Sequence, residues 1–362
     1  MKILYVITGL AQGGAERVVS DLADGMFKKG HEVKIAYLTG DIVTRPEHEE
    51  IELIQVNLKD IRTLLPAYIR LAQIIKNFQP DVVHSHMVHA NILTRLVRIS
   101  TPINKLICTA HSSNEGGIVR MLGYRVTHRL ADFSTNVSQE AAQAFKNMGA
   151  VPNNGMLTVY NGISLEKFKN IPKARARLEQ ELNLNRNYKI ILAVGRFNKA
   201  KDYPNLLYAI NLLKKEVSYP FKVIIAGDGE LRESVEKKVN NLGLYEDIIL
   251  LGRRNDIPEL MSAADLFVLP SKYEGFGLVI AEAIACECLV VATDCGGVAE
   301  VLNNPDFLVL PEDPVALKNK IKQVLDLSCS KKQNVISKNT RWVRENFSLE
   351  EIIKKWNFLY NE

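Results

Sequence analysis

Short apolar runs alternate with longer amphipathic segments along the first half of the chain. Each short run is bounded by turn residues and predicts a buried strand. Strands are expected at residues 2–7, 33–38, 52–56, 82–84, 105–109 and 133–137. Helical spacing predicts helices at residues 15–29, 66–78, 90–100, 118–130 and 139–148. This alternation indicates an α/β protein with a doubly wound parallel sheet, which binds ligands at the carboxyl ends of its strands.

The second half repeats the alternation and carries the most informative stretch of the chain. Strands are expected at residues 189–195, 221–226, 248–251, 265–269 and 289–292. The run 265–269 is stopped by Pro270 and followed by Glu274-Gly-Phe-Gly277, after which a helix pattern begins. Glycines there allow backbone N–H groups to approach a ligand at a helix N-terminus, where the helix dipole favours an anion. We interpret this turn as a phosphate-binding site.

Two glutamates lie in this stretch, eight positions apart. Glu274 precedes the predicted helix, and Glu282 falls at its second turn among apolar residues. Eight residues carry a helix about 80° past two full turns, so the two side chains need not point the same way. A carboxylate on an apolar helix is rarely tolerated without a partner, which marks Glu282 as a candidate functional residue.

The run Pro270-Ser-x-x-Glu-Gly-Phe-Gly-Leu-x-x-x-Glu-Ala resembles the Glu-x7-Glu signature of retaining glycosyltransferases of the GT4 family, which have the GT-B fold. The resemblance extends from Gly13-Gly14 to Glu282 and includes Val159-x-Asn-Gly-Ile163. It implies two Rossmann-like doubly wound domains that face each other across a cleft, as the length of 362 residues also permits. Residues 1–168 would bind the acceptor, residues 169–346 the donor, and residues 347–362 would form a helix crossing back to the first domain.

Two cations follow the strand predicted at residues 189–195. Arg196 offers a planar fork and Lys201 a compact charge, and both suit a diphosphate. The GT4 pattern has the same Arg and Lys, usually followed by Gly. Asp202 takes the place of that Gly here, and we expect it to alter the turn without removing the lysine. Arg253 lies near where the family binds the nucleobase.

Two features of the first half also fit the family. The loop Gly9-Leu-Ala-Gln-Gly-Gly-Ala-Glu16 lacks the Gly-x-Gly-x-x-Gly order of a dinucleotide-binding protein. It resembles the GT4 loop Gly-Gly-x-Glu, which implies that Gly14 approaches the donor diphosphate; a simple turn of small residues is the alternative. His111 follows the strand at residues 105–109, where GT4 enzymes have a histidine that contacts the donor sugar.

The implied reaction moves a sugar from a nucleotide diphosphate sugar to a saccharide, with retention at the anomeric carbon. The leaving diphosphate would be stabilised by cations and by the N–H groups near Gly277 and Leu278. Glu282 would bind the ribose and Glu274 the donor sugar. The catalytic candidates are Glu274, His111, Arg196 and Lys201. The donor-binding candidates are Gly14, Arg196, Lys201, Arg253, Glu274, Gly277, Leu278 and Glu282. A UDP sugar is the expected donor, and a GDP sugar is the alternative.

Neither a metal nor another cofactor is expected. His84, His86 and His89 form a possible ligand set, but no aspartate stands beside them, and histidines at a strand end lining the cleft are the plainer interpretation. Cys286 and Cys288 have no second pair to complete a zinc site. Rival functions are a GT-B sugar-nucleotide epimerase, an NAD-dependent oxidoreductase, which the missing glycine fingerprint disfavours, and a non-catalytic sugar-nucleotide binding protein.

Charge, hydropathy and cysteine content lead us to expect a cytoplasmic protein. The net charge of +5 is too small for a dedicated nucleic-acid binder, no apolar run is long enough to span a bilayer, and five unpaired cysteines suit a reducing compartment. The helix at residues 118–130 carries Arg120, Arg125 and Arg129 among apolar residues. It suits either an anionic membrane surface or an ordinary solvated face. With the membrane interpretation, the enzyme would extend a lipid-linked oligosaccharide of a bacterial surface polysaccharide at the inner leaflet.

Overall fold

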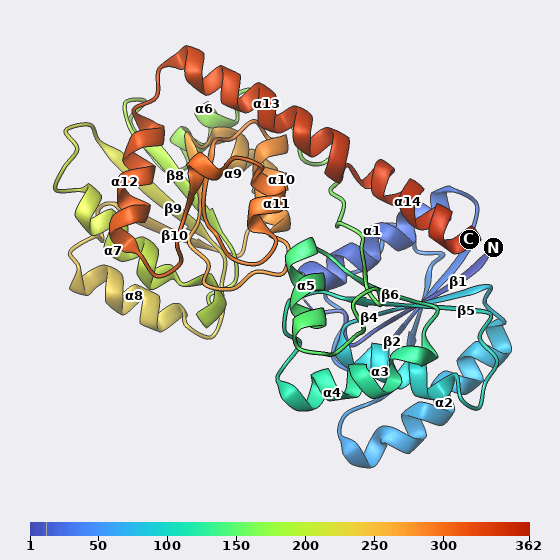
Figure 1. The fold of residues 1–362 in the computed structure, drawn as a ribbon. Helices are drawn as coiled ribbons and strands as arrows, with labels where there is room; N and C mark the ends of the chain where they lie inside the picture. The colour runs from blue at the N-terminus through green and yellow to red at the C-terminus, as the bar shows by residue number, and fades with distance from the viewer. Residues whose placement is uncertain (12) are drawn as a thin grey trace. The chain divides into compact units, whose positions relative to one another are not determined.

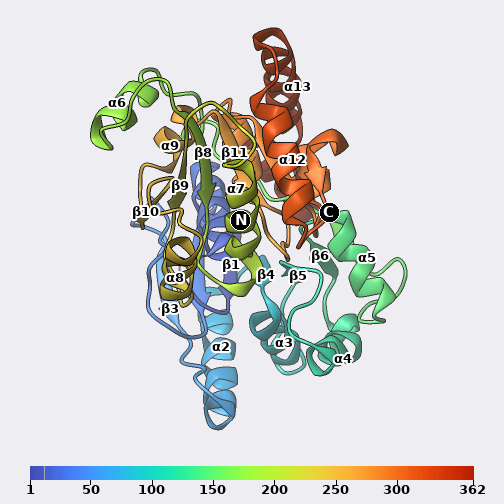
Figure 2. The ribbon, with the colours of Figure 1, turned by 90° about the vertical axis from the view of Figure 1, so that its left-hand side faces the viewer.

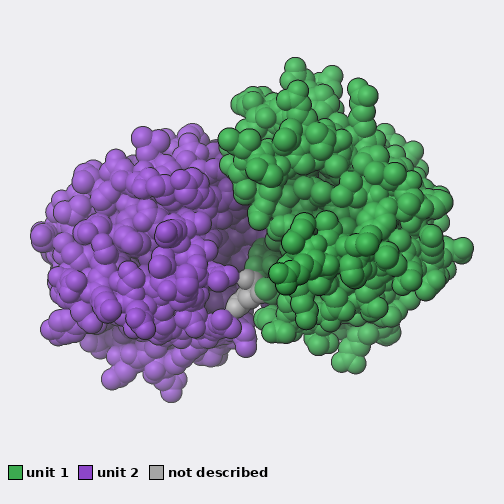
Figure 3. Space-filling model, turned by 90° about the horizontal axis from the view of Figure 1, so that it is seen from below, with its two compact units in different colours: residues 1–162, 349–362 green, residues 163–348 purple. Residues whose placement is uncertain are grey.

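The computed structural model describes residues 1–11 and 13–362, which form two compact units (Figures 1 and 3). The first unit joins residues 1–162 to residues 349–362, and the second contains residues 163–348. The predicted domain boundaries fell after residues 168 and 346. The second unit begins earlier because the backbone N–H of Ile163 donates to the carbonyl of Phe347 over 2.8 Å, and Ile163 forms a bridge with Ser348.

A parallel sheet of seven strands, in the order β3-β2-β1-β4-β5-β6-β7, forms the centre of the first unit. Its strands are β1 (Lys2–Ile7), β2 (Glu32–Tyr37), β3 (Glu52–Gln55), β4 (Val82–His86), β5 (Lys105–Ala110), β6 (Phe133–Asn136) and β7 (Leu157–Thr158). The central strands β1 and β4 are buried on both faces, as in other parallel sheets covered by helices; β1 is a mostly apolar run, whereas β4 buries His84, Ser85 and His86. In the register of the sheet, Ile3 lies between Val33 and Val82.

Helices cover both faces of this sheet. They are α1 (Gly14–Lys28), η1 (Ile61–Thr63), α2 (Leu64–Phe78), α3 (Val88–Val97), α4 (Ile118–Thr127), η2 (His128–Leu130), α5 (Gln139–Asn147) and α14 (Leu349–Asn361). Figure 1 shows α1 and α14 on one side of the sheet and α2, α3 and α4 on the other. The C-terminal helix α14 packs against α1, so the end of the chain completes the first unit.

The second unit contains a parallel sheet of six strands, in the order β10-β9-β8-β11-β12-β13. The strands are β8 (Lys189–Val194), β9 (Phe221–Ala226), β10 (Ile248–Gly252), β11 (Leu266–Leu269), β12 (Val290–Thr293) and β13 (Leu308–Val309). The helices are α6 (Ala174–Glu181), η3 (Lys199–Lys201), α7 (Tyr203–Leu213), α8 (Arg232–Asn241), α9 (Ile257–Ala263), α10 (Leu278–Ala285), α11 (Val298–Leu302), η4 (Pro305–Phe307), α12 (Pro314–Leu325) and α13 (Cys329–Phe347). Figure 2 shows β8, β9 and β11 with α7 and α8 beside them.

The first strand of each sheet lies between its second and fourth strands, so the strand order reverses there. In the first unit the reversal lies between β1 and β4, and in the second between β8 and β11. Ligands of such sheets bind at this reversal, outside the carboxyl ends of the strands. The predicted α/β class with two Rossmann-like halves is therefore confirmed, and it directs attention to the loops that follow β1, β4, β8 and β11.

Within residues 1–11 and 13–362, no helix is long and apolar enough to cross a membrane.

Candidate functional site

The loops that follow β8 and β11 are joined by backbone hydrogen bonds. The N–H groups of Lys272 and Tyr273 donate to the carbonyl of Ala200 over 2.7 and 3.3 Å. The side chain of Asn198 caps η3 by accepting from the N–H of Lys201 over 3.1 Å. These bonds hold two distant segments together at the reversal of strand order, where the sequence placed its candidate cation and its candidate carboxylate.

Lys201 and Glu274 form an ion pair at this point. The Nζ atom of Lys201 lies 2.5 Å from Oε1 of Glu274, and the two side chains are only 19% and 13% exposed. Ser271 donates its hydroxyl to the same oxygen over 2.7 Å. Because both side chains are shielded from water, the attraction between the two charges is screened less than in an exposed ion pair. Ser271 was not predicted as a site residue, although it stands in the run that carries the resemblance.

Asp202, which departs from the family pattern, keeps the turn that a glycine would make. Its φ of 42° and ψ of 50° lie in the left-handed region, which glycine adopts most easily. Its carboxylate offsets the cost by capping α7, where it accepts from the N–H of Asn205 over 3.3 Å. Burial raises the pKa of this carboxyl group. Asp202 therefore adopts a backbone conformation that glycine favours, and Lys201 stays paired with Glu274.

The loop that follows β12 supports the loop that carries Glu274. Gly296 has a φ of 56°, and a Cβ atom built on it would lie 1.9 Å from the carbonyl oxygen of Glu274. The hydroxyl of Thr293 and the thiol of Cys295 both donate to the carbonyl of Ser271. Close backbone approach therefore requires glycine at position 296. The sequence showed a loop of small residues there without indicating what they contact.

The helix that follows Glu274 begins as the sequence predicted. Gly277 caps α10 with a φ of 84° and a ψ of 42°, and Leu278 is its first residue. The first N–H groups of a helix have no partner within it and are available to an anion. Glu282 lies on α10 and is 7% exposed, so the structure places this carboxylate in a buried position.

Arg196 and Arg253 stand apart from the ion pair. Arg196 is 64% exposed, and its Nε lies 3.1 Å from Oε2 of Glu230. Arg253 is 68% exposed, and its Nε lies 3.8 Å from a carboxylate oxygen of Asp228. Both carboxylates belong to the turn that follows β9. The sequence grouped Arg196 with Lys201, but the structure gives each cation a different acidic partner.

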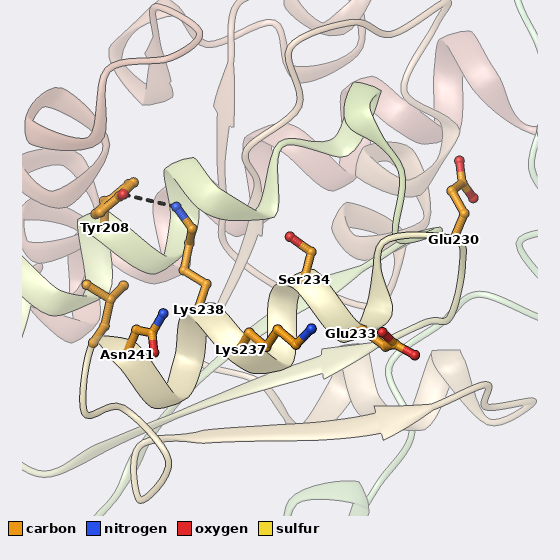
Figure 4. A pocket seen from close by; sticks show the side chains of 8 residues that line it. Tyr208, Glu230, Glu233, Ser234, Lys237, Lys238 and Asn241 are labelled. Atoms are coloured by element: carbon orange, nitrogen blue, oxygen red, sulfur yellow. Dashed lines mark hydrogen bonds between the residues drawn. The ribbon is translucent and has the colours of Figure 1, made fainter.

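A hollow of about 520 Å³ lies beside α8, as Figure 4 shows. It is lined by Tyr208, Glu230, Glu233, Ser234, Lys237, Lys238, Asn241 and Leu242. Lys238 donates to the hydroxyl of Tyr208 over 2.9 Å and lies over its ring. Glu230 lines this hollow and also forms the ion pair with Arg196, which is one of the predicted site residues.

The histidines of β4 are more deeply placed than the sequence predicted. The strand continues to His86 rather than ending at His84, because His86 pairs in register with Thr109 of β5. His84 and His86 are both fully buried. His84 bonds the hydroxyls of Tyr360 and Thr109, each over 2.7 Å, so it lies in the core and not at a strand end lining a cleft.

His86 contacts the candidate catalytic histidine. Its Nδ1 lies 3.0 Å from Nε2 of His111, which follows β5 directly. The backbone N–H of His111 donates to the carboxylate of Glu115 over 2.8 Å. Burial lowers the pKa of His111 to about 4 and also holds the pKa of His86 well below its ordinary value, so both rings are neutral at pH 7.

The remaining candidates are the glycine loop after β1 and the possible metal ligands. Gly14 is the first residue of α1, and Gln12, in the middle of the predicted glycine loop, lies outside the described residues. In the part of the chain that the structure describes, no three His, Cys, Asp or Glu side chains are grouped as a metal ion would need. The histidines at positions 84, 86 and 89 and the cysteines at 286 and 288 therefore do not form such a group.

Two family models match the chain. Residues 12–167 match the model described as Glycosyltransferase Family 4, and residues 174–342 match Glycosyl transferases group 1. A Campylobacter jejuni protein named GalNAc-alpha-(1->4)-GalNAc-alpha-(1->3)-diNAcBac-PP-undecaprenol alpha-1,4-N-acetyl-D-galactosaminyltransferase is 26% identical over an alignment 371 residues long, which covers 98% of this chain and 97% of that protein.

Two further proteins are similar. The Escherichia coli UDP-Gal:alpha-D-GlcNAc-diphosphoundecaprenol alpha-1,3-galactosyltransferase is 27% identical over 316 residues, 84% of this chain and 80% of its own. The crystal structure of Anabaena Alr3699/HepE in complex with UDP has a TM-score of 0.87 and 22% identity, and the match covers 100% of both chains.

Proposed function

The chain belongs to the glycosyltransferases, with a Family 4 domain followed by a group 1 domain, and we propose that it transfers a sugar from a UDP sugar to a lipid-linked saccharide with retention. Its fold is the predicted GT-B fold. The proposal on the donor is supported most by one observation, the shielded Lys201–Glu274 pair at the reversal of strand order beside the first turn of α10.

The pair and the helix suit the two ends of a sugar diphosphate. As the glycosidic bond breaks, negative charge develops on the leaving diphosphate. Lys201 supplies a fixed positive charge, and the N–H groups at the start of α10 supply oriented dipoles, so this charge is stabilised without a metal ion. Glu274, held by Ser271 and Lys201, is placed to bind hydroxyls of the sugar. The buried Glu282 would accept hydrogen bonds from the ribose.

The exposed arginines are proposed to join the site only when the donor binds. Arg196 and Arg253 are paired with Glu230 and Asp228 on the surface. A diphosphate carries more charge than one carboxylate and accepts bidentate hydrogen bonds, so it competes for the guanidinium groups. His111 is proposed to contact the sugar that is transferred. The N–H groups near Gly14 are proposed to approach the diphosphate.

The donor and the acceptor are proposed from relatives as well as from the site. The E. coli relative is named for UDP-Gal and a diphosphoundecaprenol acceptor, and the C. jejuni relative for a PP-undecaprenol acceptor. The Anabaena structure contains UDP. A uridine diphosphate sugar and a polyprenyl-diphosphate saccharide are accordingly the pair to test first.

A nucleotide-sugar panel tests this function. The protein is heated with UDP, GDP and their sugars, with and without EDTA, because a bound ligand raises the melting temperature by mass action. We expect UDP sugars to stabilise the fold equally with and without EDTA, and proton NMR to show the same anomeric configuration in donor and product. Stabilisation that requires a divalent cation would contradict metal independence. Conversion of the sugar nucleotide without acceptor would instead indicate an epimerase.

The helix α4 is proposed as the contact with an anionic membrane surface at the cytoplasmic face. Ile118, Val119, Leu122 and Val126 are 88%, 83%, 55% and 71% exposed, while Met121 and Tyr124 are buried on the opposite face. Three arginines, at positions 120, 125 and 129, accompany this exposed apolar row. Apolar insertion together with attraction to anionic lipid is how such helices bind a bilayer.

Vesicle sedimentation tests the contact. The double variant Ile118→Ser/Val119→Ser should lose binding to vesicles that contain phosphatidylglycerol. The control Ile99→Ser removes an apolar side chain that is 68% exposed outside α4, and it should bind like the wild type. Equal binding of both variants, or no binding by the wild type at low salt, would contradict the assignment.

A further inference from the structure

We propose that His86 positions His111 by donating its Nδ1–H to Nε2 of His111, which fixes His111 as the tautomer that carries its proton on Nδ1 and can donate it in a hydrogen bond. The inference rests on the proposed function only for what that donor binds. The tautomer itself follows from the contacts of His84 and His86 on β4 with His111, which directly follows the neighbouring strand β5, and nothing in the sequence pattern paired His86 with His111.

The contacts of His84 hold the His86 ring in place. His84 has both ring nitrogens bonded, Nδ1 to the hydroxyl of Tyr360 and Nε2 to the hydroxyl of Thr109. Thr109 is bonded in turn to Thr135 over 2.7 Å. The His86 ring lies against the ring of His84, with 4.0 Å between ring centroids and an angle of 38° between the ring planes. These contacts hold the His86 ring in one orientation in the core and direct its Nδ1 at His111.

The ring protons of His86 and His111 allow only two arrangements of the hydrogen bond between them. Burial holds the pKa of His86 and of His111 below the ordinary histidine value, so each neutral ring carries one N–H at pH 7. Their contact, 3.0 Å between Nδ1 and Nε2, needs one donor and one acceptor. Either His86 carries its proton on Nδ1 and donates, or it carries it on Nε2 and accepts.

The other nitrogen of His86 decides between these states. Nε2 of His86 is fully buried and has no hydrogen-bond partner among residues 1–11 and 13–362. If His86 accepted, its own N–H would be stranded in the core, and buried N–H groups without a partner are rare. If His86 donates, only a lone pair is left there, which costs less. His86 is therefore the donor.

This tautomer limits what His111 can do. Its Nε2 is occupied by the bond from His86, and its Nδ1 already carries a proton. A neutral His111 then offers a hydrogen bond to a hydroxyl or to a developing oxyanion, but it has no free lone pair to remove the proton of the acceptor hydroxyl. His111 acts as a donor of a hydrogen bond and not as a general base.

Nitrogen NMR of the histidine rings, recorded on the full chain without substrate, tests the tautomer. The two-bond couplings of ¹⁵N-labelled histidine should show the His111 proton on Nδ1 in the wild type. His86→Asn keeps an N–H donor close to the position of Nδ1, and it should retain this tautomer. His86→Leu removes the donor, and its His111 should shift toward the Nε2–H form.

Activity gives a second measurement. His86→Leu should lower kcat by about tenfold or more, the cost of losing a group that orients a functional histidine, while His86→Asn stays within about threefold of wild type. A proton on Nε2 of His111 in the wild type, or an unchanged tautomer in His86→Leu, would overturn the inference. If the wild-type tautomer is as stated but no nucleotide sugar binds, the proposed function fails and the inference about His86 stands.

Discussion

The first six strands of each unit follow the same order, but the two units place different chemistry at the carboxyl ends of the strands near the reversal of that order. In the second unit this edge carries a charged pair, Lys201 and Glu274, separated by 2.5 Å. In the first unit it carries two neutral rings, His86 at the end of β4 and His111 after the neighbouring strand β5, with 3.0 Å between Nδ1 of His86 and Nε2 of His111. The same backbone plan therefore supplies an anion-stabilising charge in one half and a neutral hydrogen-bond donor in the other.

Histidine content separates the two units further. All seven histidines of the chain lie in the first unit, at positions 31, 48, 84, 86, 89, 111 and 128. The second unit, residues 163–348, contains none. A change from pH 7 to pH 5 can therefore protonate histidines only in the first unit. The second unit has no histidine that could respond to this change. Three experiments can break or sharpen this contrast.

The largest effect is expected from removing the cation of the second unit. Lys201→Ala should lower the rate of transfer by about 10²-fold or more, because it removes a fixed positive charge that stabilises the leaving diphosphate. The matched control is Lys199→Ala, since Lys199 lies two positions away on η3 and is exposed. The Lys199→Ala enzyme should retain activity. Steady-state assays of sugar transfer measure both variants, and a Lys201→Ala enzyme that works at the wild-type rate would show that Lys201 has no role in the mechanism.

A smaller loss of activity is expected when Glu274 is kept but its loop is displaced. Gly296→Ala would place a methyl group 1.9 Å from the carbonyl of Glu274, which forces the loop to move. We expect activity to fall at least about tenfold, because small displacements of reacting groups are costly. Gly243→Ala is the control, since Gly243 also has a positive φ, of 65°, but open space around its Cβ position.

Gly243→Ala should lose about 1 kcal/mol of stability, because alanine is strained in the left-handed region, and Gly296→Ala should lose more, because its methyl group also meets the carbonyl of Glu274. Only Gly296→Ala should lose activity. Equal activity of the two variants would show that the loop after β12 does not position Glu274.

The effect of pH should appear in one unit and not in the other. Burial lowers the pKa of His84, His86 and His111, so below the ordinary value of about 6.5 the unfolded chain takes up protons that the folded chain does not. The stability of the first unit is therefore complete above that value and falls with decreasing pH, by up to about 1.4 kcal/mol per pH unit for each histidine.

The two tryptophans report on the units separately. Trp356 lies against His84 in the first unit, with 4.4 Å between ring centroids, and Trp342 lies on α13 in the second. In Trp342→Phe, fluorescence of Trp356 should show a urea midpoint that falls from pH 7 to pH 5. In Trp356→Phe, the midpoint reported by Trp342 should hold. A Trp356 midpoint that does not move with pH would contradict burial of neutral histidines.

Local patterns in the sequence predicted the elements but not the partners. The strand β11, the turn at residues 274–277 and the helix α10 were predicted because apolar run, proline and glycines follow one another directly. The pairing of Lys201 with Glu274 depends on β8 lying beside β11, which no local pattern shows. The fold class alone makes that neighbourhood visible.

The histidines show the same limit. The sequence displayed His84 and His86 as a cluster, and a cluster suggested a metal site or the lining of a cleft. Their actual partners come from far along the chain, since His84 bonds Tyr360 on α14 and His86 bonds His111 after β5. The buried hydroxyl and ring partners could not be identified before the sheet order was known.

The central claim is that the nucleotide sugar binds at the loops after β8 and β11 of the second unit, and a crystal structure with a bound UDP sugar tests it most directly. We predict diphosphate oxygens within hydrogen-bond distance of Nζ of Lys201 and of the N–H of Leu278, with ribose hydroxyls at Glu282. A nucleotide bound away from these groups, for instance in the hollow beside α8, would contradict the account.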